Sequence, residues 1–234
     1  GEAVFVDGTG GSDMFDIGSF ERVKFRNLTF TSNNSATRAF FSTGTPDSFL
    51  VENCRFVEDG DPFGAVARFQ SGSLVSRVRF VNCTADCFTG IFIGRGLDCV
   101  IEDCSFVGQG GGNTCLELSP GTAGSGDGQT IIRGCRIDNY AQGILEYGPK
   151  ATVTDCILTQ VDGAVEVRGV GSQVRNVDAT LDATGGTTGI VVVGANTRIT
   201  DCAIENPRDP ATYPAGTDPV GIALANTSGC FISF

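Results

Sequence analysis

A six-residue pattern of apolar and polar positions recurs eight times along the chain. Its first, fourth and sixth positions are apolar or Cys, its third position is Asn, Asp or Gly, and the other two vary. The copies are residues 25–30, 51–56, 80–85, 101–106, 132–137, 153–158, 174–179 and 199–204. They recur every 21 to 31 residues, and self-similarity at this period predicts a repeat architecture built from one small unit.

The alternation inside each copy predicts two short strands joined by a bend. Apolar residues that flank one variable residue are typical of a strand with one buried face. The bend falls at the third position, because Asn, Asp and Gly accept a left-handed backbone at low cost. A further apolar strand follows in several copies, led by Gly90, Gly143, Gly163, Gly189 and Gly221. A unit this short leaves no room for a helix, so we expect an all-β coil of parallel strands.

These residues resemble the right-handed parallel β-helix superfamily, the pectate-lyase-like fold also found in bacteriophage tailspikes and surface adhesins. The resemblance covers roughly residues 20–234 and rests on the Asn/Asp–Cys bend and the Gly–Ile strand. It implies a single-stranded right-handed parallel β-helix, or β-solenoid, of about eight coils. A β-sandwich is the alternative, and it would explain the strands and glycines but not the regular bends. The fold hosts lyases, hydrolases, epimerases and non-catalytic fibres, so it leaves the activity open.

The domain organisation expected from the pattern is simple. Residues 1–19 have the weakest repeat register and are expected to form an irregular N-terminal coil. Residues 20–234 are expected to form one β-helical domain, as a piece of a longer chain. Residues 225–234 run like residues 97–103, which places Cys230 where Cys99 sits. The apolar strand at residues 225–234 is expected either because the chain is a fragment of a longer protein or because this strand docks onto another subunit, in a homo-oligomer or end to end.

The net charge of the chain limits the classes of molecule that it is expected to bind. The net charge is −11 and the isoelectric point is about 4.4. So acidic a chain is a poor partner for nucleic acid or for an anionic membrane surface. No apolar segment approaches the length of a membrane span, and residues 1–7 do not read as a signal peptide. We therefore expect no nucleic acid and no membrane insertion.

Six of the ten cysteines share the fourth position of the repeat. They are Cys54, Cys83, Cys104, Cys135, Cys156 and Cys202, and Leu28 and Val177 fill the same position in the other copies. Interchange with Leu and Val indicates a small buried apolar site, so we expect a column of reduced thiols. Pairing of Cys87, Cys99, Cys115 and Cys230, which lie off that column, is left open.

Candidate catalytic chemistry depends on carboxylates, because the chain contains no His. Glu117, Glu146 and Glu166 align in three consecutive glycine-led strands, and we expect them to stack outward in a row. Carboxylates on adjacent strands would lie at separations suited to glycoside hydrolysis. Arg168 could orient an acidic sugar, and Tyr140 and Tyr147 could stack on one if exposed. The alternatives are a solvated acidic face, and binding of a cation or sugar without catalysis.

Two acidic loops are candidate calcium sites. Glu58, Asp59 and Asp61 lie in one turn, and residues 7–16 hold further acidic positions among glycines. Carboxylates in turns are ligands that Ca²⁺ accepts, although neither loop has an EF-hand spacing. Apart from calcium, no cofactor is expected.

The sequence thus predicts an extracellular or virion-surface structural module, like a tailspike or fibre, with a lateral face for polysaccharide or cell-surface glycan. The catalytic residues of β-helical polygalacturonases, alginate epimerases and pectate lyases have no counterparts here that can be placed residue by residue. An enzyme is the alternative, as a glycoside hydrolase or polysaccharide lyase that uses the stacked glutamates. A self-assembling filament subunit is a third possibility.

Overall fold

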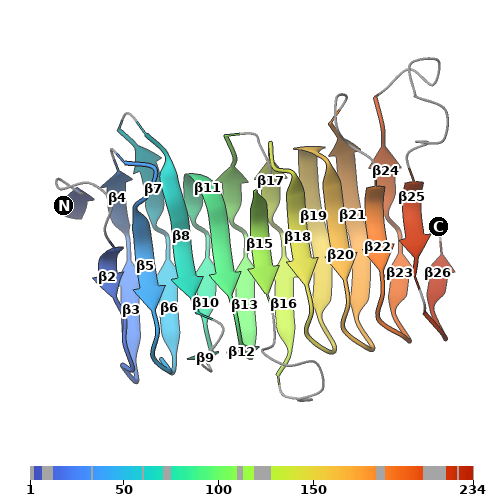
Figure 1. Cartoon of the computed structure of the whole chain (residues 1–234), viewed down its shortest axis with the longest axis horizontal. Coiled ribbons are helices and arrows are strands. Elements are labelled where there is room, and N and C mark those ends of the chain that lie inside the picture. Colours follow the sequence, from blue (N-terminus) through green and yellow to red (C-terminus); the bar gives the residue numbers. More distant parts are fainter. Residues whose placement is uncertain are drawn as a thin grey trace.

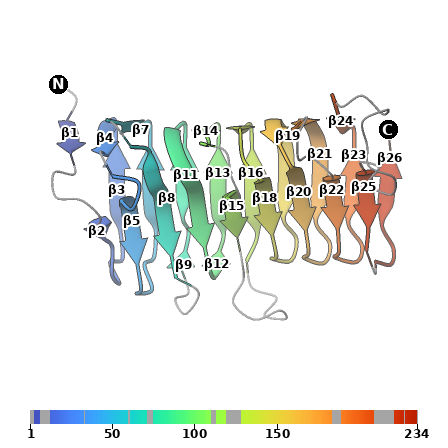
Figure 2. The ribbon, with the colours of Figure 1, turned by 45° about the horizontal axis from the view of Figure 1, so that its top comes forward.

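The computed structural model describes residues 3–6, 13–32, 34–59, 61–70, 75–109, 113–118, 128–182, 188–207, 220–225 and 227–233. These residues form strands and turns, with no α-helix among them. Figures 1 and 2 show strands stacked side by side along one long axis, with the two termini at opposite ends. Every strand pairing is parallel, so the described chain is a β-solenoid, as the repeat predicts.

Three columns of strands run along the solenoid, two of them in sheet A and one in sheet B. The first column of sheet A contains β3 (Val23–Arg26), β6 (Phe49–Glu52), β10 (Arg79–Val81), β13 (Cys99–Glu102), β16 (Thr130–Arg133), the first parts of β19 (Thr152–Val161) and β21 (Gln173–Leu181), β23 (Arg198–Thr200) and β26 (Phe231–Ser233). The second contains β1 (Ala3–Val6), β4 (Leu28–Ser32), β7 (Arg55–Glu58), the first part of β11 (Thr84–Ile93), β14 (Ser105–Val107), β17 (Arg136–Asp138), the later parts of β19 and β21, and β24 (Ala203–Glu205).

Sheet B forms the third column. It contains β2 (Asp13–Asp16), β5 (Arg38–Ser42), β8 (Phe63–Phe69), the later part of β11, β15 (Thr114–Leu118), β18 (Gln142–Glu146), β20 (Gly163–Val167), β22 (Thr188–Val192) and β25 (Val220–Leu224). A small two-stranded sheet pairs β9 (Val75–Ser76) with β12 (Gly96–Leu97). Because β1 and β2 pair with β4 and β5, parallel pairing begins within the segment expected to be an irregular N-terminal coil.

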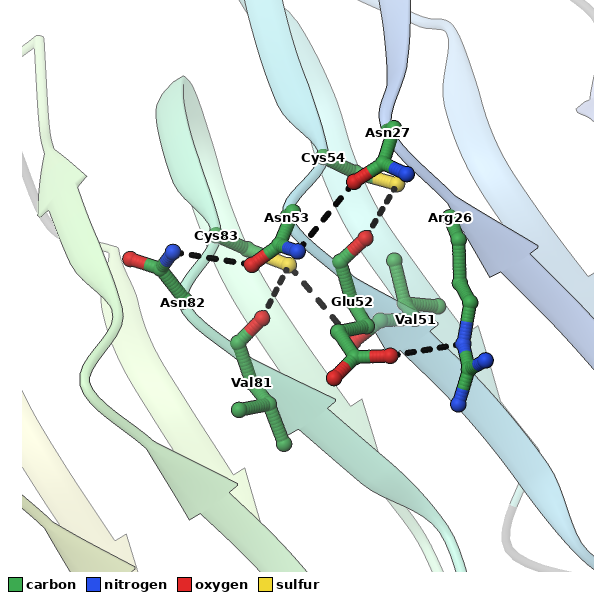
Figure 3. Close-up of polar contacts among 9 residues, drawn as sticks. All are labelled: Arg26, Asn27, Val51, Glu52, Asn53, Cys54, Val81, Asn82 and Cys83. Atoms are coloured by element: carbon green, nitrogen blue, oxygen red, sulfur yellow. Dashed lines mark hydrogen bonds and ion pairs between the residues drawn. The ribbon is translucent and has the colours of Figure 1, made fainter.

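The predicted bends lie between the two columns of sheet A, and all eight have a left-handed backbone. Their φ values lie between 50° and 63°, at Asn27, Asn53, Asn82, Asp103, Gly134, Asp155, Asn176 and Asp201. Asn and Asp tolerate this conformation because their short side chains bond locally. Figure 3 shows how the bends stack: Asn53 Nδ2 donates to Asn27 Oδ1 at 3.1 Å, and Asn82 Nδ2 donates to Asn53 Oδ1 at 2.8 Å. The side-chain amides therefore form a ladder along the axis.

A second corner with a left-handed backbone was not predicted from the sequence. It is formed by Ser48, Arg77, Asp98, Lys150, Gly171, Asn196 and Gly229. Backbone amides there donate to carbonyl groups of the next coil, as Arg77 does to Leu97 at 2.8 Å. The residue types at this corner vary too much to form a recognisable motif.

The core changes character along the axis. Phenylalanines fill the N-terminal half, where the rings of Phe30 and Phe56 stack with centroids 4.9 Å apart. Aliphatic residues and cysteines dominate the later coils. The predicted thiol column is confirmed: its members are free and buried, except for the half-buried Cys202. Each thiol donates to the carbonyl two residues earlier, as Cys83 does to Val81 at 3.4 Å (Figure 3).

The direction of the amide ladder generates a first prediction. Asn53, Asn82 and Asn176 each donate to the preceding coil, but the Asp103 carboxylate has no proton to give to the Asn82 oxygen. Asp103→Asn should extend the ladder and raise the free energy of unfolding by about 0.5–1.5 kcal/mol, measured by urea denaturation.

Asp155 provides the matched control for this substitution. Its Oδ1 accepts from Asn176 Nδ2 at 2.7 Å, and the preceding position is Gly134, which has no side chain to accept a bond. Asp155→Asn should therefore bring no gain in stability. Equal gains from both substitutions would show that loss of charge, rather than extension of the ladder, is the cause.

A second prediction concerns the glycines of sheet B. A Cβ added at Gly143 would lie 2.3 Å from Leu158 Cδ2 and 2.7 Å from the Ala164 carbonyl oxygen, whereas one at Gly221 would meet nothing within 4 Å. Gly143→Ala should lower the free energy of unfolding by about 1–3 kcal/mol because the core is overpacked. Gly221→Ala, in the same column, should be neutral or stabilising by up to about 1 kcal/mol. Equal effects in thermal melts would contradict the observed packing.

Candidate functional site

The strand register of sheet B separates the three predicted glutamates. Glu117 pairs with Leu145, which pairs with Glu166, whereas Glu146 pairs with Leu118 and Val167. The expected outward row of three is therefore wrong. The cause is a one-residue shift: Gln142, and not Gly143, lies opposite Gly163, and such a shift moves a side chain to the other face.

Glu146 consequently points into the core. Its side chain is 1% exposed, and neither carboxylate oxygen has a hydrogen-bond partner. Glu117 and Glu166 remain on the outer face, separated by the strand that carries Leu145. Two strand spacings place their backbones about 9.6 Å apart.

The residues expected to bind substrate also divide between the two faces. Tyr140 is buried, and its hydroxyl donates to the Cys87 carbonyl oxygen at 2.9 Å, so it is not available to stack on a ligand. Tyr147 lies half-buried at the edge of sheet B, with the Arg168 guanidinium 4.7 Å from its ring centroid. Arg168 also forms an ion pair with Glu166, which raises the pKa of the guanidinium. Glu166 and Arg168 therefore share a face, as predicted, but they neutralise each other.

A groove on the outer face of sheet B is the most developed candidate site. It has a volume of about 360 Å³ and crosses β5, β8, β11 and β15. Its walls include Arg38, Ala65, Arg68, Thr89, Phe92 and Glu117. Strand pairing places Arg68 between Phe41 and Phe92 in one column, which continues to Glu117. We call this the Arg68 groove.

The two arginines of the Arg68 groove differ in whether a carboxylate neutralises them. Arg38 is paired with Asp13 and lies over the Phe41 ring, 4.1 Å from its centroid. Arg68 is exposed, has no ion-pair partner among the described residues, and lies 5.5 Å from the centroid of the Phe92 ring. Partial burial raises the pKa of Glu117, and nearby Arg68 opposes that shift. The groove therefore offers one uncommitted cation and one carboxyl that holds its proton more strongly than usual.

A second, smaller hollow of about 240 Å³ lies farther along sheet B. Gln142, Asp162, Glu166 and Thr188 contribute to its walls. It brings Glu166 to the surface but contains no aromatic ring and no cation.

The structure does not assemble the predicted calcium ligands. Glu58, Asp59 and Asp61 are exposed, and the described residues contain no group of three or more Cys, Asp or Glu side chains that could hold a metal ion. In the other loop, residues 7–12 lie outside the described residues, and Asp13 is committed to Arg38.

The cysteines outside the thiol column do not form disulfides, and burial makes Cys87 and Cys99 poor nucleophiles. Cys87, Cys99, Cys115 and Cys230, for which pairing was left open, are all free. Burial raises the pKa of both Cys87 and Cys99 to about 12, so each remains a thiol near neutral pH.

Charged side chains on sheet A pair between neighbouring coils. Arg26 Nε lies 2.6 Å from Glu52 Oε2 (Figure 3), and Arg133 pairs with Glu102. Exposed pairs of this kind contribute little to stability and do not form a site.

Sequence reasoning missed the residues that build the Arg68 groove. Arg38, Arg68 and Phe92 belong to strands whose outward residues change from coil to coil, so no single residue type marks the column. The available signal was the position within the repeat. Equivalent five-residue segments of β5, β8, β11 and β15 each carry one groove-column residue at their fourth position, namely Phe41, Arg68, Phe92 and Glu117.

Similarity to individual known proteins is weak. No curated protein matches the chain. Among solved structures, a plasmid-mediated fluoroquinolone resistance protein, QnrB1, is similar with a TM-score of 0.41 and 14% identity over 96% of this chain and 92% of that chain. A likeness of this degree carries no argument about fold or activity. The part of the chain that the structure describes contains no helix with the length and apolar character of a membrane span.

The sequence pattern of a known family matches residues 3–149, which is more than half of the chain. The family is described as the right-handed β-helix region, and both the parallel pairing and the stacked bends agree with it. The chain therefore belongs to the right-handed β-helix family.

Proposed function

We propose that the chain is a structural β-helix module of an extracellular or virion-surface fibre, and that the outer face of sheet B binds a polysaccharide. The observation that carries this proposal is the Arg68 groove, where an aromatic ring, an unpaired guanidinium and a carboxyl line one hollow. A concave surface with a few convergent polar groups is the usual form of a ligand site.

The composition of the groove suits a sugar chain. The face of Phe92 offers apolar area for the C–H groups of a pyranose ring, while Arg68, Thr89 and Glu117 offer hydrogen bonds to its hydroxyl groups. The groove crosses four strands, which span about 14 Å at the usual strand spacing. That length accommodates several sugar units along the solenoid axis.

The charge distribution favours an acidic sugar. A guanidinium binds a carboxylate through two parallel hydrogen bonds, and no carboxylate in the described part of the chain is paired with Arg68 in this way. The chain as a whole carries a net charge of −11, which disfavours non-specific binding of anionic polymers. Binding of a uronic-acid polymer would therefore depend on this groove.

Cleavage of the bound glycan is a second candidate function, and one observation favours it. Glu117 is the groove residue whose pKa is raised, mainly by burial, and a proton donor in glycoside hydrolysis requires such a shift. Glu166 is the nearest outward carboxylate in the same column, but Arg168 holds it.

A third prediction tests the binding site. Arg68→Ala and Phe92→Ala should each weaken binding of a uronic-acid polysaccharide by about 10- to 100-fold in calorimetric titrations, through loss of a charged hydrogen bond or of the apolar platform. Arg79→Ala is the control, because Arg79 is an exposed arginine on sheet A. If Arg79→Ala weakened binding as much as the groove variants do, the groove assignment would be wrong.

A fourth prediction separates binding from catalysis. If the wild-type chain shortens a bound polysaccharide, Glu117→Gln should abolish cleavage while retaining affinity within a few-fold, because the amide keeps the shape but cannot donate a carboxylic proton. Chain length is followed by size-exclusion chromatography. Cleavage that survives in Glu117→Gln would exclude Glu117 as the general acid. If the wild type binds the polysaccharide without cleaving it, catalysis is excluded and only the structural, binding function remains.

A further inference from the structure

Glu146 is the one acidic residue among the described members of an inward-facing column of sheet B. The other members of its column are Ser42, Phe69, Ile93, Leu118, Val167, Val192 and Leu224. Its two carboxyl oxygens are the only buried side-chain nitrogen or oxygen atoms without a hydrogen-bond partner in the described part of the chain. A buried polar group without a partner is costly, so its retention requires an explanation.

The groups around this carboxyl cannot neutralise a charge. The adjacent strands present Leu118 from β15 and Val167 from β20. The backbone of Gly148 packs closely, since a Cβ added there would lie 2.7 Å from Glu146 Oε1. The Gly148 amide and the Thr130 hydroxyl lower the pKa of Glu146 in part, but neither makes a hydrogen bond of normal geometry with it.

The titratable and charged groups nearby are few. The Cys99 thiol of β13 faces the same part of the core, and the negative charge of Glu146 contributes to its raised pKa. Asp98, beside Cys99, is an acid as well. The cations lie elsewhere: Lys150 is exposed, and Arg168 is paired with Glu166 on the outer face. An ionised Glu146 would therefore be a buried anion without a counterion among the described residues.

Glu146 lies where a buried side chain can still reach water. It is the last residue of β18, and the turn at Tyr147–Lys150 follows directly. Movement of this turn would bring the carboxyl to solvent at the cost of two backbone hydrogen bonds to neighbouring coils, from Tyr147 to Leu118 at 2.9 Å and from Lys150 to Val170 at 3.0 Å, while the pairs within β18 remain. The same movement would uncover the part of the core that contains Cys99.

We propose that Glu146 makes this corner of the solenoid a proton-dependent device, closed while the carboxyl is protonated and opened at the turn of residues 147–150 when the proton is lost. This inference is independent of glycan binding. Burial alone is enough to bias the equilibrium, because the closed state excludes water from the carboxyl and the open state does not.

The sign of the pH dependence follows from the direction of the shift. Burial raises the pKa of Glu146 from its ordinary value of 4.5 to about 8 in the closed state. The closed state therefore holds the proton more tightly than the open state. Its stability is complete below about pH 4.5, falls as the pH rises, and levels off above about pH 8. Within that window the open population should rise about tenfold per pH unit.

A fifth prediction tests this device through the thiol of Cys99. The protein is labelled briefly with a small thiol reagent at pH 6 and pH 8, and each cysteine is quantified by peptide mass spectrometry. The ratio of labelling at Cys99 to that at Cys104, which is buried in the thiol column, cancels the intrinsic pH dependence of thiols and any global unfolding. In the wild type this ratio should rise by about 50-fold.

Two variants keep the test decisive. Glu146→Gln removes the ionisation at nearly the same volume, and Glu146→Leu restores the apolar residue found at Leu118 in the same column. In both variants the ratio of Cys99 to Cys104 labelling should be independent of pH. At pH 8, Cys99 should be labelled less in Glu146→Leu than in Glu146→Gln. A constant ratio in the wild type, or the same rise in Glu146→Leu, would overturn the proposal.

Discussion

In-register stacking of parallel strands is the constraint on which the rest of this structure depends. Each coil satisfies its backbone hydrogen bonds with the coils before and after it, so a residue is always placed above its counterpart at the spacing of paired strands. A side chain on a strand of an inner coil therefore has two neighbours fixed by register. The amide ladder, the thiol column and the outer column through Arg68 are three results of that one constraint.

The bends and the thiol column could be predicted from the sequence because their chemistry is local and repeated. At all eight bends of sheet A the left-handed residue is Asn, Asp or Gly, so the motif marks the position directly. Alternation of Cys with Leu28 and Val177 likewise identifies one buried site, whatever the lengths of the loops between copies. The second corner escaped prediction because Ser48, Arg77 and Lys150 adopt the same backbone without a shared residue type.

The candidate site was harder to predict because sheet B lacks such a marker. Glycine leads several of its strands, but Gly143 and Gly163 occupy different positions in the register. If the two glycines are treated as equivalent, Glu146 is predicted to lie on the outer face, and the usual preference of glutamate for solvent agrees with that wrong prediction. The Arg68 groove depends on neighbours far apart in sequence, which become adjacent only when the register is known.

Anomalous scattering from the sulfur atoms in a crystal of this chain would test the stacking most directly. The account predicts that Cys54, Cys83, Cys104, Cys135 and Cys156 give one row of peaks along the solenoid axis, at intervals of about 4.8 Å. Sulfur peaks dispersed through the molecule, or a row interrupted among these five residues, would contradict the register and with it the proposed groove.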